Sequence, residues 1–208
     1  MRLAKTVWAV SLTGALVVLA GCSGGDESPA DPTSTSSPSE AGSTPAPAPT
    51  ASPTRAAGDS DTTIPPARPA GLAGPPSEQA AGEAATYFHE LAPYAFATGD
   101  LQAWNAMSSE SCSFCAAIAA QVEAEAAAGK HREGGQVQVL DVQSYHHKKQ
   151  QYAALVTLRE YESRVIASDG SVDGEVDYKQ DVQLEMLLTW NGTGWVVDGV
   201  DVKYANKL

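Results

Sequence analysis

Proline is scarce in the C-terminal part of this 208-residue chain. Twelve of the thirteen prolines lie between Pro29 and Pro76, and only Pro93 lies beyond them. The segment from Ser23 to Pro76 in turn contains no Phe, Trp or Tyr. A segment without large apolar side chains cannot bury enough surface to offset the entropy that it loses on ordering. We therefore expect a single folded domain at 77–208, preceded by a disordered tether.

Basic side chains are also few. Residues 77–208 contain 19 acidic and 9 basic side chains, which gives a net charge of −10. Nucleic acids and anionic lipid surfaces are recognised through basic patches, so this balance excludes both as partners of the domain and favours solubility. The one concentrated basic stretch is His146-His147-Lys148-Lys149. We interpret it as a solvated hairpin loop, with contact to anionic cell-wall polymers as the alternative.

Motifs that carry common chemistry are missing too. The sequence contains no Gly-rich phosphate loop, no H-E-x-x-H and no nucleophile elbow. It therefore offers no catalytic constellation, and we expect no cofactor and no bound metal.

The N-terminus does carry a clear signal. Arg2 and Lys5 precede an apolar run, Val7–Ala20, which is shorter than the ~20 residues of a membrane-spanning helix but suits the core of a signal peptide. The run ends in Leu19-Ala20-Gly21-Cys22, which resembles the bacterial lipobox. The resemblance implies that residues 1–21 are removed and that lipidated Cys22 becomes the mature N-terminus.

Lipid on Cys22 would make the membrane the first partner of this protein. A lipobox cysteine receives at least two acyl chains, such as palmitate, and two chains anchor a protein stably where one does not. We therefore expect a cell-membrane protein, lipid-anchored on the extracytoplasmic face. Residues 22–76 would then form the tether, rich in Ser, Thr, Pro and Ala, that spaces the domain from the bilayer. Such a composition is also typical of an O-glycosylated stalk, and the sequence leaves that alternative open.

The first half of the domain has helical periodicity. Ser77 is a good N-cap and Gly99-Asp100 a good stop, so we expect a helix between them, kinked at Pro93. A short second helix and a third that ends at Gly129 should follow. The apolar positions with helical spacing are Ala81, Ala84, Ala85, Phe88, Leu91 and Ala95, then Leu101, Trp104 and Met107, and finally Cys115, Ile118, Val122 and Ala126.

After Gly134-Gly135 the period changes to two, which predicts four strands. A turn is expected at Asp169-Gly170 and a tight hairpin at Asn191-Gly192. The predicted strands are centred on Val137–Val139, Tyr152–Leu158, Val182–Trp190 and Val196–Tyr204. The predicted inward positions are all apolar: Val156, Leu158, Val182, Leu184, Met186 and Leu188.

Helices followed by an antiparallel meander indicate an α+β fold. The order resembles the roll of nuclear transport factor two-like and ketosteroid-isomerase-like domains. The stretch Tyr94–Asp100, then Ser109 and Cys112-Ser113-Phe114-Cys115, is similar to actinobacterial lipoproteins that carry an uncharacterised domain of this kind. The resemblance implies N-terminal helices packed on the concave face of a curved four-stranded antiparallel sheet. It implies no activity.

Cys112 and Cys115 form a C-x-x-C at the expected start of the third helix, and three interpretations compete. Thioredoxin-like chemistry uses this motif, but in a βαβ context with a later proline that this chain lacks. A zinc site needs two more ligands. The candidates are His146 and His147, but consecutive residues of a strand point to opposite faces. An exported chain with two remaining cysteines fits a structural disulfide best.

The residues that could line a cleft are Tyr87, His89, Tyr94 and Trp104. Among them His89 is the candidate base, although it has no identifiable carboxylate to orient it. We expect it at the domain boundary with a solvated edge, and the two tyrosines, which share a helix face, as packing residues.

Two functions remain open at this point. The first is a non-catalytic envelope module that contacts a protein, a wall polymer or a small apolar ligand. The second is a pocket enzyme of the isomerase or hydrolase type on the same roll, which would need a polar group among the inward strand positions. Because those positions are apolar, the sequence favours the first.

Overall fold

The structure, a computed structural model, describes residues 61–208. The predicted signal peptide, Cys22 and most of the predicted tether lie outside these residues. Within the described part, no helix is long and apolar enough to span a membrane.

One short 3-10 helix and three α-helices come first in the described residues, and the three α-helices are those that the helical periodicity predicts. Ser77 caps α1 by accepting the backbone N–H of Ala80 at 3.1 Å, and Gly99 ends the helix in the left-handed conformation. The helix continues through Pro93. The elements are η1 (Ala70–Ala73), α1 (Glu78–Thr98), α2 (Gln102–Met107) and α3 (Ser113–Ala127).

Seven antiparallel strands follow and form two sheets. The larger sheet has the order β2-β3-β6-β7 and contains the four predicted strands. The smaller sheet has the order β1-β4-β5. The strands are β1 (His131–Gly134), β2 (Val137–Lys148), β3 (Gln151–Glu160), β4 (Ser163–Ile166), β5 (Val172–Val176), β6 (Gln180–Trp190) and β7 (Trp195–Lys207).

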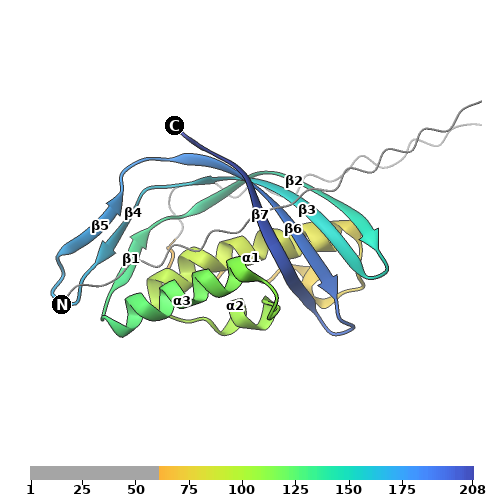
Figure 1. Ribbon diagram of the computed structural model, residues 1–208, viewed down its shortest axis with the longest axis horizontal. Helices are drawn as coiled ribbons and strands as arrows, with labels where there is room; N and C mark the ends of the chain where they lie inside the picture. Colours follow the sequence, from red (N-terminus) through yellow and green to blue (C-terminus); the bar gives the residue numbers. More distant parts are fainter. Residues whose placement is uncertain (1–60) are drawn as a thin grey trace, which may run out of the picture. The chain divides into compact units, whose positions relative to one another are not determined.

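The smaller sheet corrects the prediction of one four-stranded sheet. Its strands continue those of the larger sheet across short breaks, and Figure 1 shows β1, β4 and β5 extending away from β2, β3 and β6. Gly134 and Gly135 both have positive φ, and a Cβ at Gly134 would overlap the carbonyl oxygen of Glu162. Only glycine fits so close a backbone approach, so this pair separates β1 from β2.

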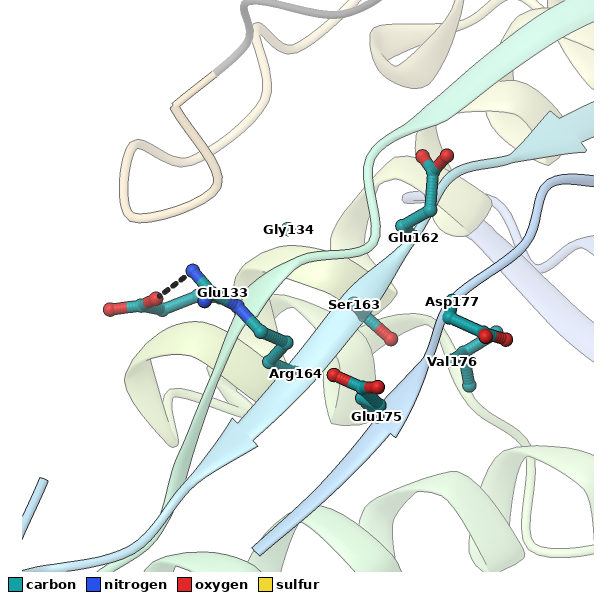
Figure 2. A pocket seen from close by; sticks show the side chains of 8 residues that line it. All are labelled: Glu133, Gly134, Glu162, Ser163, Arg164, Glu175, Val176 and Asp177. Carbon is teal, nitrogen blue, oxygen red and sulfur yellow. Dashed lines mark hydrogen bonds and ion pairs between the residues drawn. The ribbon is translucent and has the colours of Figure 1, made fainter. Parts of the chain in front are cut away.

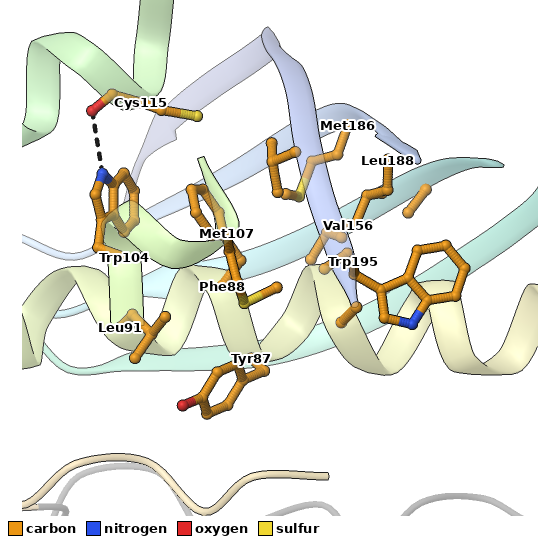
Figure 3. Packing of buried hydrophobic residues seen from close by; sticks show 14 of the residues in the cluster. Tyr87, Phe88, Leu91, Trp104, Met107, Cys115, Val156, Met186, Leu188 and Trp195 are labelled. Carbon is orange, nitrogen blue, oxygen red and sulfur yellow. Dashed lines mark hydrogen bonds between the residues drawn. The ribbon is translucent and has the colours of Figure 1, made fainter. Parts of the chain in front are cut away.

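The helices cover one face of the larger sheet (Figure 1). Alternation along β6 is clear, because its even-numbered residues from Val182 to Trp190 are buried and the odd-numbered ones between them are not. The six predicted inward positions are confirmed, since each is at most 5% exposed. Figure 3 shows Val156, Met186 and Leu188 of the sheet facing the buried helix residues.

Residues before Ser77 also belong to the packed domain. Leu72 in η1 is buried, and the indole N–H of Trp195 donates to the carbonyl of Gly71 at 2.9 Å. The composition of this segment, which contains no aromatic residue, predicts a tether. Its contacts depend instead on Trp195, an aromatic residue at the other end of the domain.

Candidate functional site

Tyr87 and Trp104, two of the candidate cleft residues, lie in the core. Tyr87 is 3% exposed and Trp104 is 1% exposed. The Trp104 ring stacks on Phe88 with 4.0 Å between ring centroids, and its indole N–H donates to the carbonyl of Cys115 at 3.1 Å. Figure 3 shows Phe88 and Met107 between α1 and the sheet, whereas Tyr87 points away from the sheet, toward the segment before α1, where the Arg68 guanidinium lies 5.8 Å from the centre of its ring. Tyr87 and Trp104 are therefore packed side chains rather than the lining of an opening.

His89 is buried, and the expectation of a solvated edge is wrong. It is 6% exposed, and its Nε2 has no hydrogen-bond partner. The same face of α1 carries Gly82, where a Cβ would come within 3.1 Å of Val142 on β2. So close an approach of α1 to β2 accounts for the burial of the imidazole two turns further along the helix.

The chemistry of His89 follows from this burial. Desolvation lowers the pKa of the imidazole from 6.5 to about 4, so the ring is neutral at pH 7. The shift has no contribution from a neighbouring charge. A catalytic base needs a partner that orients it and a substrate within reach, and this arrangement provides neither.

Tyr94, the fourth candidate, is only partly buried and lies two turns after Tyr87 on α1. Its hydroxyl donates to Asp100 at 2.9 Å, and this bond raises the pKa of the phenol. The second oxygen of Asp100 accepts the backbone N–H of Gln102 at 2.9 Å. Tyr94 therefore braces the turn between α1 and α2.

Cys112 and Cys115 are joined in a disulfide within the described structure. Both residues are at most 1% exposed. Cys112 is the N-cap of α3, and its sulfur accepts the backbone N–H of Cys115 at 3.1 Å. A bond so enclosed is typical of a structural disulfide and unlike the exposed sulfurs of redox enzymes.

A hollow of about 250 Å³ lies where the two sheets meet. Figure 2 shows its acidic side chains pointing in different directions and the ion pair between Arg164 and Glu133 at 3.1 Å. Among the described residues, no cluster of His, Cys, Asp and Glu has the arrangement of a metal site. The hollow is lined by Glu133, Gly134, Glu162, Ser163, Arg164, Glu175, Val176 and Asp177.

Sequence reasoning missed this hollow, because β4 and β5 are short and carry no marked alternation. The available signal was Gly134-Gly135, which marks the kink beside it. The basic stretch at 146–149 is exposed, as expected of a hairpin loop.

Comparisons with known proteins give a family. No curated protein matches the sequence. Among solved structures the chain is similar to the intermembrane space region of chloroplast protein ARC6, with 10% identity and a TM-score of 0.46 over 62% of this chain and 98% of that one. The model of a family of unknown function, DUF6318, matches residues 63–201. That match covers most of the described domain, and the chain belongs to the DUF6318 family.

Proposed function

We propose that this protein is a lipid-anchored lipoprotein whose C-terminal domain works by binding a partner outside the membrane. In this proposal the chain is an actinobacterial lipoprotein, and its larger sheet and helices form a nuclear transport factor two-like roll. An envelope protein or a cell-wall polymer is the proposed partner. A net charge of −10 at 77–208 disfavours nucleic acid and the anionic bilayer surface itself.

The filled concave face is the observation that carries the binding function. The sheet positions that would form the floor of a cleft are apolar and covered by Phe88, Trp104 and Met107. His89 is the only buried polar residue of the described chain, and its pKa is lowered by burial alone. The groups available to a partner therefore lie on the outside of the domain.

The proposed anchor rests on the lipobox, which lies before the described residues. We expect the mature protein to fractionate with membranes and to begin at lipid-modified Cys22. Cys22→Ala removes the thiol that accepts the lipid, so this variant should be released or left unprocessed. Ser23→Ala is the matched control, since it changes the neighbouring residue and keeps the thiol. Mass spectrometry that finds an unmodified N-terminus at another residue contradicts the anchor.

The alternative is a pocket enzyme of the isomerase or hydrolase type, and it requires that substrate reach a polar group such as His89. Diethylpyrocarbonate, which acylates accessible neutral imidazoles, tests this requirement in the native protein. We expect modification of exposed His147 and none of His89 until the domain is unfolded. Equal rates at both residues, measured by peptide mass spectrometry, would show that the core opens and would favour the enzyme.

A further inference from the structure

Strand β7 forms an edge of the larger sheet, and half of its length is uncovered. Near the start of the strand, the carbonyl of Val197 accepts the backbone N–H of Ser109 at 3.0 Å, and the carbonyl of Asp198 accepts the hydroxyl of Ser111 at 3.4 Å. From Gly199 onward, no described element pairs with this side of β7. Residues 201–207 are all exposed. Residues 61–208 therefore present an open strand edge about seven residues long.

The register identifies which backbone groups point outward from this edge. The backbone N–H of Trp190 donates to the carbonyl of Gln150, on the β3 side of the strand. The direction of the backbone N–H and C=O groups alternates along a strand, so those of every second residue of β6, counted back from Trp190, also point toward β3. In the β7 residues opposite these positions, the backbone N–H and C=O groups point away from β6 and are free. Past Asp198 these residues are Val200, Val202, Ala205 and Lys207.

The spacing of these four residues is symmetric because of a bulge. One extra residue is inserted in β7 between the partners of Gln183 and Leu184. The outward positions are therefore separated by two, three and two residues along the strand. An antiparallel copy of the same edge offers donors and acceptors in the same pattern, with Val202 of one copy opposite Ala205 of the other.

The side chains along this edge also suit a second copy. Val202 is 50% exposed and Tyr204 is 37% exposed, so apolar surface flanks the free backbone. Asp198 and Asp201 lie toward the start of the strand, and Lys203 and Lys207 lie toward its end. Antiparallel pairing centred between Lys203 and Tyr204 brings no like charges opposite one another, because Asp201 then faces Asn206 and Lys203 faces Tyr204.

Lysines on an edge strand commonly protect it from pairing, but these two are engaged within their own chain. The Lys203 ammonium contacts Glu185 at 2.5 Å and Asp201 at 2.7 Å. The Lys207 ammonium lies 3.8 Å from the centre of the Tyr178 ring. Neither ammonium is left as an unpaired charge along the open edge.

The other long edges are less suited to a second copy. The first turn of α1 covers part of β2, where the Glu78 carboxylate accepts the backbone N–H of His146 at 2.9 Å and the Glu78 carbonyl accepts the hydroxyl of Ser144 at 2.6 Å. Strand β5 is only five residues long, and its charged residues Asp173 and Glu175 are both acidic. Two copies of β5 would bring like charges together.

We propose that the protein forms a two-fold dimer through antiparallel pairing of β7 with β7 of a second copy. The register places Val202 opposite Ala205 and Asp201 opposite Asn206, and it joins the two larger sheets into one of eight strands. This dimer does not depend on the lipid anchor.

Sedimentation equilibrium of the full chain tests the proposal, with Cys22→Ser to exclude lipid. We expect a reversible monomer–dimer equilibrium. Val202→Pro removes an outward N–H and leaves the ladder with β6 intact, so it should weaken the dimer roughly tenfold or more while the melting temperature holds. Val202→Thr keeps the N–H and the branched shape and should dimerise normally. A chain that stays monomeric, or a dimer indifferent to Val202→Pro, overturns the proposal.

Disulfide trapping tests the register and remains informative even where the proline variant fails to fold. A mixture of Val202→Cys chains with Ala205→Cys chains should cross-link on mild oxidation, since opposite residues on paired strands lie about 5.5 Å apart. Either variant alone should not cross-link, because its two thiols would lie several residues apart. Equal cross-linking in all three samples, or none in the mixture, rejects this register.

Discussion

His89 couples the stability of the domain to pH. Its folded pKa of about 4 lies below the ordinary value of 6.5, so the unfolded chain takes up a proton first as the pH falls. The stabilisation is complete above pH 6.5 and decreases as the pH falls toward 4. The difference between these two pKa values corresponds to about 3 kcal/mol of unfolding free energy at the acid end.

Urea unfolding at a series of pH values measures this effect. The variant His89→Leu lacks the titrating group. Between pH 7 and pH 4 we expect its free energy of unfolding to fall by about 3 kcal/mol less than that of the wild type. His147→Gln is the control, because His147 is exposed and its replacement should leave the profile unchanged. Carboxylates with lowered pKa, such as Glu125 beside Arg132, contribute equally to all three proteins. If the stability of the wild type and of His89→Leu changed with pH in parallel, the role given to the lowered pKa of His89 would be contradicted.

Features of single residues that depend on local chemistry can be predicted from the sequence. Ser77 and Gly99 are the observed helix caps, because a hydroxyl at an N-cap and a glycine after a helix act within their own turn. The sequence places His89 at the boundary of the domain, since the spacing of apolar residues along α1 does not indicate how closely β2 approaches the helix. The burial of His89 depends on a contact between distant segments, which a periodicity within one helix does not contain.

Single elements differ in how well their sequence specifies them. Strand β6 was predicted well, because strict alternation fixes both its register and its buried face. The loop after β6 is longer than the expected tight Asn-Gly turn. In this loop the backbone N–H of Asn191 donates to the carbonyl of Gly194. The Asn191 side chain accepts the backbone N–H groups of Thr193 and Gly194, both at 2.9 Å. Asparagine serves either arrangement, so the dipeptide alone does not decide between them.

Strands β1, β4 and β5 show the opposite case. They are only four or five residues long, so no period distinguishes them from loops. Contacts made after folding hold them in place. The Arg132 guanidinium of β1 pairs with Glu125 of α3 at 2.5 Å and lies 3.7 Å from the centre of the Phe96 ring. Such long-range partners are absent from any local pattern.

Two adjacent leucines test the face assignment of β6. Leu188 is fully buried, whereas Leu187 lies on the opposite, partly exposed face. Leu188→Asp places an unpaired carboxylate in the core and should unfold the domain. Leu187→Asp introduces the same residue into the same strand and should cost about 1 kcal/mol or less. Thermal melts compare the two variants, and equal losses would mean that the faces are wrongly assigned.

The whole domain extends further toward the N-terminus than its composition suggests. A chain of residues 61–208 keeps η1, the burial of Leu72 and the bond from Trp195 to Gly71, whereas a chain of residues 77–208 loses all three. One buried leucine and one hydrogen bond together are worth about 2–4 kcal/mol. We expect the shorter chain to unfold at correspondingly lower urea concentration. Leu72→Ala in the longer chain should lose part of this stability, and equal stability of the two lengths would contradict the role of η1.

The bond between Trp195 and Gly71 also constrains the order in which the domain can form. The two residues are separated by 124 positions in the chain. As the chain emerges from its N-terminal end, Gly71 is available early, before its aromatic partner in the last strand. The central β6 strand, likewise, pairs with β7 only after almost the entire chain is available. Contacts of such high sequence separation slow folding, so the apolar faces of α1 and β3 stay exposed until nearly the whole chain has emerged.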